Sequence, residues 1–461
     1  MEKKRILVAL MCLAAVVTGL ETDAQEARAR AELLDLIQRE KFDLVLPGAM
    51  RDNGVDMWIH VIRDGDPDAL ALDLGGSAGY FIFTDRGGDR IERAVLAGRG
   101  QGMYTSGAYD IFAWTDWNAW YPNHDATELR EFIEERDPQR IAVNTSAWLA
   151  AADGLSHSGY QQLVEALGET YAARLVSSEN LITDFRVRRV QSEIIAFARA
   201  GETTRQILER ALSREVITAG LTTGEDVAWW VQERLLEAGL GSSFGLSRPI
   251  VIHSAVAEPE EYRSDNYAFQ RGDLLQYDMG VKYLNFGTDM KRNAYLLRDG
   301  EAALPEDIRR AWDDGRRARD IMRRNIRTGR TARETLAAVV AALEAEGFVY
   351  TPFVNFGVRD QQIVESFDRA DVTGISIDCH VVGNTGNSQI AVGPSFAPFR
   401  ELRADLMIQP NNIFSFEFVT HTAMPSFAGR RLRINFEDNV IVTTQGVELL
   451  YPRNERILLI R

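Results

Sequence analysis

Four acidic residues set within apolar, strand-like stretches constrain the fold of this chain more than any other feature. They are Asp278, Asp289, Glu417 and Glu437. A carboxylate in a protein interior costs several kcal/mol unless it is paired or binds a cation. The stretches around Glu417 and Glu437 are too apolar to be edge strands, so water alone does not explain these two acids. We therefore expect the four carboxylates to face one another or a shared cation.

The first pair of acids lies in a predicted hairpin. Residues 272–280 form a strand-like segment that contains Asp278, and a turn-rich stretch precedes Asp289. If the chain folds back near Tyr283-Leu284, the two carboxylates become cross-strand neighbours at about 5 Å. Two bare carboxylates so close would repel, and a divalent cation would remove the conflict. A pair of solvated hairpin aspartates explains this fragment equally well.

The second pair repeats the pattern nearer the C-terminus. Residues 413–419 and 432–442 are strand-like segments that each carry one acid between apolar residues. The connecting stretch 425–429 has the composition of a turn. Glu417 and Glu437 lie symmetrically about this turn, so they can face each other across the hairpin.

A single histidine joins these acids between the two hairpins in sequence. His380 lies in the strand-like segment 375–382. Four carboxylates and one imidazole can bind two hard or borderline cations, and one histidine among oxygens suits Mn, Co or Zn better than Cu or an iron–sulfur cluster.

These segments resemble the M24 metallopeptidases, the pita-bread enzymes that include methionine aminopeptidases, prolidases and Xaa-Pro aminopeptidases. The family's D-x-G strand matches Asp278-Met279-Gly280, and its S/T-D-x-x-R segment matches Thr288–Arg292. The family's metal-binding histidine, with a glycine three residues later, matches His380 with Gly383. Its S-x-E strand matches Ser415-Phe416-Glu417. The family's R-x-E-D-x-v-x-V-T strand resembles Arg433–Thr443, with one extra residue between Arg433 and Glu437.

The resemblance implies an α+β pita-bread catalytic domain preceded by an α/β creatinase/prolidase-like N-terminal domain. The sequence itself changes character near residue 185: strand-like runs mixed with helical stretches give way to four long amphipathic helices and strand pairs. The helices are predicted over 190–213, 223–239, 306–324 and 332–346. We therefore place the N-terminal domain at 25–185 and the catalytic domain at 186–461, after a signal peptide over 1–24.

The resemblance also implies site roles. The implied metal ligands are Asp278, Asp289, His380, Glu417 and Glu437, holding two divalent ions, Mn first, with Co or Zn as alternatives. A metal-bridging hydroxide would attack the scissile carbonyl, and Glu417 would pass the proton to the leaving amine.

Two departures from the family pattern concern histidines. The family's second, substrate-facing histidine is Asn387 here, and its histidine before the first aspartate is Glu261. His253 and His421 are candidates to take over a catalytic role, and a loop or core histidine is the simpler alternative. Metal binding is therefore better supported than proline-directed cleavage.

The function these motifs favour is an exported dinuclear-metal peptidase that hydrolyses N-terminal peptide bonds, Xaa-Pro bonds among the candidates. Two alternatives stay open. One is a non-peptidase hydrolase acting on a small C–N bond, as creatinase does. The other is a non-catalytic metal-binding or peptide-binding module. The substrate would be a peptide or small amide, and whether the family's common homodimer forms stays open.

Charge and the N-terminal segment limit partners and location. The net charge of −15 argues against nucleic acid as the main partner. The N-terminus has the pattern of a signal peptide: a charged start, an apolar run over residues 6–20, and then Thr22-Asp23-Ala24. We therefore expect export to the periplasm or medium, without stable membrane insertion after processing. Cleavage after Ala24 would leave Cys379 as the one cysteine and no internal disulfide.

Overall fold

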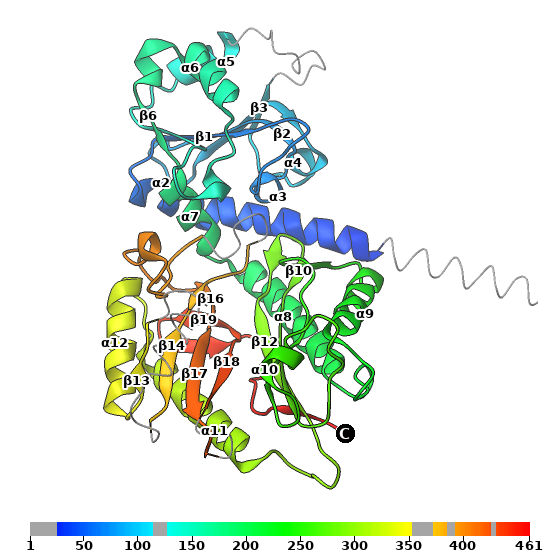
Figure 1. Ribbon diagram of the computed structural model, residues 1–461. Coiled ribbons are helices and arrows are strands. Elements are labelled where there is room, and N and C mark those ends of the chain that lie inside the picture. The colour runs from blue at the N-terminus through cyan, green and yellow to red at the C-terminus, as the bar shows by residue number, and fades with distance from the viewer. Residues whose placement is uncertain (1–24, 114–126, 353–371, 385–391, 426–429) are drawn as a thin grey trace, which may run out of the picture. The chain divides into compact units, whose positions relative to one another are not determined.

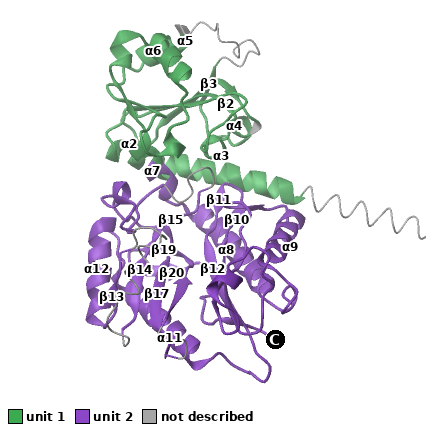
Figure 2. Ribbon diagram, in the orientation of Figure 1, with its two compact units in different colours: residues 1–182 green, residues 183–461 purple. Residues whose placement is uncertain are grey.

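The computed structural model describes residues 25–113, 127–352, 372–384, 392–425 and 430–461 (Figure 1). The predicted signal peptide and Asn387 lie outside these ranges. The chain divides into two compact units, residues 1–182 and 183–461 (Figure 2), whereas the sequence placed the boundary after residue 185. None of the helices in the described ranges is long and apolar enough to cross a membrane.

The N-terminal unit is built on a mixed sheet with strand order β4-β3-β2-β1-β5-β6 among the described residues. The strands are β1 (Met57–Ile62), β2 (Ala78–Thr84), β3 (Glu92–Arg99), β4 (Ile111–Ala113), β5 (Ile141–Val143) and β6 (Leu175–Ser177). The first three pair antiparallel, and β4, β5 and β6 join in parallel. The helix α6 (His157–Ala172) connects β5 to β6, as a parallel pair requires. The predicted α/β domain is confirmed.

Helices cover one face of this sheet with apolar side chains. Met57, Ile59 and Ile82 from the central strands share a buried cluster with Ile133 of α5 (Thr127–Glu134) and Leu163 of α6. The alternating side-chain directions of a strand place Met57 and Ile59 on this same face.

The first half of the C-terminal unit packs two helices on a sheet of order β21-β12-β9-β8. Its strands are β8 (Ile250–Ser254), β9 (Asp273–Met279), β12 (Met290–Leu296) and β21 (Leu458–Ile460). The helices are α8 (Gln191–Ala211) and α9 (Gly224–Glu237), and Leu208 and Val231 share a buried cluster with Leu275, Tyr277 and Ala294. Because Tyr277 faces the helices, Asp278 points to the opposite face of the sheet.

The second half repeats this plan with α11 (Glu306–Asn325), α12 (Ala332–Ala345) and a sheet of order β13-β14-β17-β18. Its strands are β13 (Val349–Tyr350), β14 (Gly374–Ile377), β17 (Phe418–Ala423) and β18 (Arg431–Phe436). Trp312 of α11 stacks on Phe436, with ring centroids 4.5 Å apart, and Phe436 stacks on Phe418 at 5.1 Å. All four predicted helices are thus confirmed to within two residues at either end.

Two smaller sheets complete the unit. One has the order β11-β10-β7 and the other β15-β16-β19-β20. Their strands are β7 (Gly241–Ser242), β10 (Val281–Tyr283), β11 (Phe286–Gly287), β15 (His380–Val381), β16 (Ile413–Ser415), β19 (Asn439–Thr443) and β20 (Gly446–Leu449).

Among the described residues, five segments of the chain pass from one sheet to another, each within two residues of a predicted site residue. The crossings fall at Gly280, Thr288-Asp289, Asp378-Cys379, Phe416-Glu417 and Glu437-Asp438. The continuous strands predicted over 375–382, 413–419 and 432–442 are therefore wrong, because each breaks into two strands of different sheets. Backbone hydrogen bonds still connect the breaks: the Asp378 N–H donates to the carbonyl of Glu417 at 3.0 Å, and that of Phe416 to Asp438 at 2.9 Å.

The register of the first hairpin differs from the prediction. The hairpin turns at Leu284-Asn285, one residue later than expected, and this shifts the pairing by two residues. Asp278 therefore lies opposite Lys291 rather than opposite Asp289. In the second hairpin Phe418 lies opposite Phe436, which is the predicted register, so Glu417 and Glu437 leave the paired strands at the same end.

Gly280 permits the close approach that the first crossing needs. A Cβ atom at this position would lie 1.8 Å from the carbonyl oxygen of Thr288. Since that neighbour is backbone held by pairing to Val281, it has no flexible side chain that could move aside.

We expect Gly280→Ala to lower the free energy of unfolding by about 1–3 kcal/mol, the usual cost of overpacking. Thermal unfolding of the full chain would measure it. Gly88→Ala is the control, because nothing lies within 4 Å of the added Cβ there. Equal melting temperatures for both variants would contradict this packing argument.

Candidate metal centre

Three of the predicted metal ligands converge on the ammonium of a lysine. Lys291 Nζ lies 2.9 Å from Asp278 Oδ2, 2.8 Å from Glu417 Oε1 and 2.6 Å from Glu437 Oε2. Asp278 lies on β9 in the first half of the unit, whereas Glu417 and Glu437 lie at one end of the β17–β18 hairpin in the second half. Three of the four acids set in apolar stretches therefore face a shared cation, and that cation is part of the chain.

Strand pairing explains how Lys291 reaches the centre. It lies on β12 directly opposite Asp278 of β9, so these two side chains point to the same face of the sheet. Its side chain is only 9% exposed. Burial alone would lower the pKa of the ammonium, but Glu417, Glu437 and Asp278 together raise that pKa well above its ordinary value. Lys291 is therefore charged in the folded protein.

His380 forms the other side of the centre. Its Nε2 lies 4.0 Å from Asp289 Oδ2 and 3.8 Å from Glu417 Oε2. Two donor atoms that each bind one ion at about 2.1 Å lie roughly 3–4 Å apart, so these separations suit a bound divalent ion. Burial lowers the pKa of His380 to about 4, which leaves the imidazole neutral and able to ligate at neutral pH.

Two groups of donors around His380 have the spacing of a metal site. In one group the ligand atoms of Asp289, His380 and Glu437 lie within 4.8 Å of one another. In the other group, the ligand atoms of Asp378, His380 and Glu417 lie within the same distance of one another. The donor set of one imidazole and several carboxylates suits a hard or borderline divalent cation.

The electrostatics of the carboxylates indicate that one ammonium does not neutralise the centre. Burial and repulsion from Asp278 raise the pKa of Asp289 well above its usual range. Burial, with repulsion from Asp289 and Glu417, does the same for Glu437. Burial would also raise the pKa of Glu417, but Lys291 and His380 outweigh it and hold that pKa below its ordinary value. The region near His380 and Asp289 therefore favours a further positive charge.

Asparagine side chains orient two of the acids. Asn439 Nδ2 donates to the backbone carbonyl of Asp289 at 2.7 Å, and its Oδ1 accepts from the Asp289 N–H at 3.3 Å. Asn435 Nδ2 donates to Glu417 Oε1 at 2.8 Å. Both asparagines are buried, so these bonds hold the backbone of Asp289 and the carboxylate of Glu417 in place.

Lys291 and Asp378 are members of the site that the sequence reasoning missed. Asp378 is buried, Arg400 donates a hydrogen bond to it, and burial with repulsion from Glu417 raises its pKa to about 7. The signal for Lys291 was its spacing of two from Asp289 inside an apolar strand. The signal for Asp378 was its spacing of two from His380, which the strand break at 378–379 obscured.

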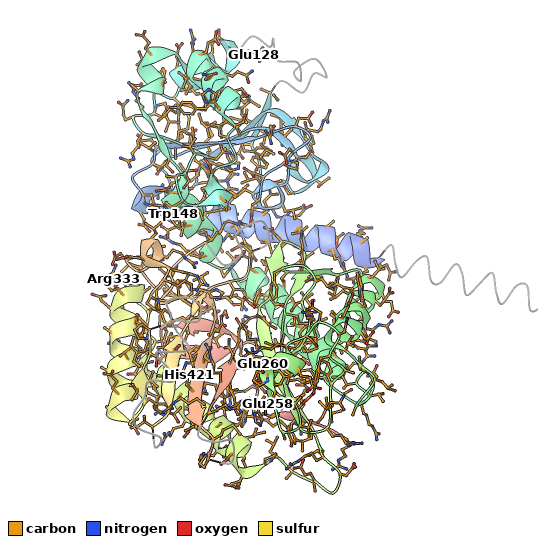
Figure 3. All side chains as sticks on the ribbon, viewed as in Figure 1. Glu128, Trp148, Glu258, Glu260, Arg333 and His421 are labelled. Atoms are coloured by element: carbon orange, nitrogen blue, oxygen red, sulfur yellow. The ribbon has the colours of Figure 1, made fainter. Side chains whose placement is uncertain are left out.

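The two histidines proposed as catalytic lie along the strands. His253 is nearly buried on β8, opposite Leu274 and on the same face as Asp278. His421 is fully buried on β17 (Figure 3), and its Nε2 is hydrogen-bonded with Ser376 Oγ at 3.0 Å. Each is four residues from its acid, about 13 Å along a strand. Burial of the His421 ring disfavours direct contact with a substrate, and the catalytic roles of both histidines stay predictions.

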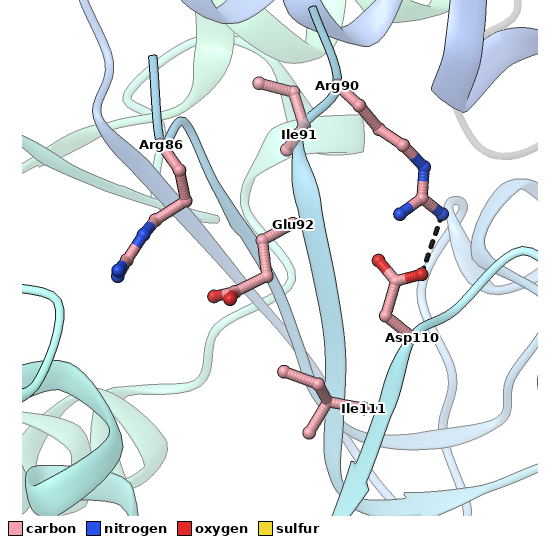
Figure 4. A pocket seen from close by; sticks show the side chains of 6 residues that line it. All are labelled: Arg86, Arg90, Ile91, Glu92, Asp110 and Ile111. Atoms are coloured by element: carbon pink, nitrogen blue, oxygen red, sulfur yellow. Dashed lines mark ion pairs between the residues drawn. The ribbon is translucent and has the colours of Figure 1, made fainter. Parts of the chain in front are cut away.

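A surface hollow lies on the N-terminal unit. It is lined by charged and apolar side chains, namely Arg86, Arg90, Ile91, Glu92, Asp110 and Ile111 (Figure 4). Arg90 is ion-paired with Asp110 at 2.7 Å. Mixed charges on an open surface do not define a ligand, so we assign no role to it.

Comparison with known families identifies the fold. Residues 196–444, more than half of the chain, match metallopeptidase family M24. The chain belongs to this family, which confirms the predicted family and supports a metal-dependent peptidase. Comparison with curated protein sequences returns no match.

Solved structures with a similar fold include X-Pro aminopeptidase from Thermotoga maritima, with 16% identity over 89% of this chain and 99% of that one, and a TM-score of 0.60. Xaa-Pro dipeptidase from Bacillus anthracis has 18% identity over 92% and 99%, with a TM-score of 0.58. Prolidase from Pyrococcus horikoshii has 15% identity over 91% and 99%, with a TM-score of 0.55. At these identities the likeness shows the shared fold, and the predicted two-domain fold class is confirmed.

The burial of His421 predicts a pH dependence of stability. Burial, with repulsion from Arg433 and Arg431, lowers its pKa from 6.5 to about 3. Below pH 6.5 the unfolded chain takes up a proton that the folded chain does not, so stability falls as the pH drops toward 3, by up to about 1.4 kcal/mol per pH unit. We expect His421→Gln to reduce this slope between pH 6.5 and 4 in denaturant unfolding.

The control for that experiment is His157→Gln, at an exposed histidine. It should leave the slope unchanged. An unchanged slope in His421→Gln as well would show that His421 does not stay neutral in the folded chain.

Proposed function

We propose that this protein is a metal-dependent peptidase of the M24 type, acting on N-terminal peptide bonds, with Xaa-Pro peptides as the first substrates to test. The observation that carries the proposal is the pair of donor groups around His380, which bring together Asp289, Glu437, Glu417 and Asp378. The solved structures of similar fold named above act on X-Pro or Xaa-Pro substrates by their titles, which supports that choice of substrate.

His380 and these carboxylates would hold the divalent ion, for which Mn²⁺ is the first candidate and Co²⁺ or Zn²⁺ the alternatives. Asp278 completes the predicted ligand set. A bound ion would supply Lewis-acid polarisation of the scissile carbonyl and lower the pKa of water.

Glu417 is the proposed proton acceptor. Its carboxylate stays ionised because Lys291 and His380 lower its pKa, and Asn435 and Lys291 fix its Oε1. Its Oε2 faces His380, so a proton taken up there would be held beside the proposed ion. The catalytic role of His253 stays a prediction.

Loss of a ligand should abolish hydrolysis. We expect Asp289→Asn and His380→Ala to reduce chelator-sensitive cleavage of Xaa-Pro and Xaa-Ala peptides more than about 100-fold, since the ion provides several kcal/mol to the transition state. Rates would be measured after loading with Mn²⁺, Co²⁺ or Zn²⁺.

The matched control is Asp299→Asn, because the Asp299 side chain is almost fully exposed. It should keep the rate of the unchanged chain. Full hydrolysis in the presence of chelator, or in His380→Ala, would refute the metal-dependent peptidase.

The non-catalytic alternative receives support from one observation. A lysine that contacts three carboxylates of the centre reduces the need for metal. Metal binding without cleavage of any peptide in the panel would favour that binding module.

We also propose export through cleavage after Ala24. The full chain with a C-terminal tag would be expressed in a Gram-negative host. The periplasmic fraction should then contain protein whose measured mass corresponds to a chain that begins at Gln25. Val16→Arg should block export, because a charge interrupts the apolar run. A tagged chain that retains Met1 in the cytoplasm would contradict the proposal.

A further inference from the structure

The two-ion centre that the family resemblance implies conflicts with the place of Lys291. A primary ammonium has three N–H donors and no acceptor. Lys291 has three carboxylate oxygens from three different residues at 2.6–2.9 Å, which is the range of charge-assisted hydrogen bonds. Its three N–H donors can therefore each be matched by one of these carboxylates.

The oxygens around Lys291 are occupied. Glu437 Oε2 accepts from Lys291, and its Oε1 accepts a hydrogen bond from Ser415 Oγ. Glu417 Oε1 accepts from both Lys291 and Asn435. An ion coordinated by these same oxygens would lie against the ammonium, where like charges repel.

The side of the centre at His380 is different. Glu417 Oε2 and Asp289 Oδ2 face His380 Nε2 at 3.8 Å and 4.0 Å, whereas the closest approach of Lys291 to Glu417 is to the other carboxylate oxygen, Oε1. Asp378 adds a carboxyl group within the same reach. One ion can therefore bind at His380 without displacing the lysine.

Charge balance agrees with a single ion. The four predicted carboxylate ligands and one ammonium leave three negative charges, and one divalent ion reduces this to one. A second divalent ion would leave an excess of positive charge in a centre where Glu437 and His380 are almost completely buried. Asp378 does not alter this balance, because it is paired with Arg400.

We propose that Lys291 is the permanent second cation of this centre, and that the chain binds one divalent ion, at His380, in place of the two that the family resemblance implies. This inference rests on the metal-binding part of the proposed function. Asp278 then belongs to the lysine rather than to a metal ion.

Metal stoichiometry tests the proposal. The full chain would be stripped with chelator, loaded with excess Mn²⁺, gel-filtered and analysed for metal per chain. We expect one equivalent in the unchanged chain and two in Lys291→Ala, which removes the charge and opens space for an ion. Lys282→Ala, at an exposed lysine of the same hairpin, should keep one equivalent.

Electron paramagnetic resonance gives a readout that is independent of turnover. The unchanged chain should show the spectrum of an isolated Mn²⁺ ion, and Lys291→Ala that of a spin-coupled pair. Two equivalents in the unchanged chain would overturn the proposal, even if Lys291→Ala fails to fold. One equivalent in a folded Lys291→Ala would overturn it too.

Peptide hydrolysis on the same samples separates the two proposals. A chain that binds one ion and cleaves no peptide contradicts the peptidase and leaves the role of Lys291 intact. A chain that binds two ions and cleaves peptides contradicts only the role of Lys291. Absence of metal from the unchanged chain would overturn both.

Discussion

The contact of one buried ammonium with three carboxylates is the interaction on which the catalytic-type unit depends. Lys291 joins Asp278 on β9 to Glu417 and Glu437 in the second half of the unit. Without a cation in that position, apolar strands could not retain these acids, because burial of unpaired carboxylates is strongly unfavourable. The lysine thus allows the fold to carry a charged centre before any ion binds.

The sheet crossings explain how so many polar groups meet in an apolar interior. Within a regular strand, only every second side chain points to one face. Where a segment leaves one sheet for another, as at Glu417 and Glu437, neighbouring residues escape that alternation and the backbone can bond to other breaks. At Gly280 the two backbone segments of such a crossing approach so closely that there is no room for a Cβ atom.

Much of the fold could be predicted because helices such as α8 and α11 have a strong apolar period, which does not depend on distant contacts. The convergence of the acids could be expected from the cost of burying them. The cross-strand partner of Asp278 could not be predicted. A turn displaced by one residue shifts the strand register by two, so Lys291 rather than Asp289 lies opposite Asp278. The breaks at Asp378 and Glu417 also escaped prediction, since apolar composition does not distinguish one long strand from two short ones.

The sequence distances spanned by Lys291 have a consequence for the order of folding. Its contacts with Glu417 and Glu437 join residues 126 and 146 positions apart. Such non-local contacts form slowly, because a long loop must close before they contribute. During synthesis the first hairpin emerges well before residue 437, so Lys291 and Asp278 can pair early while the rest of the centre waits. The nascent chain therefore carries an incomplete half-site until the second half of the unit has been synthesised.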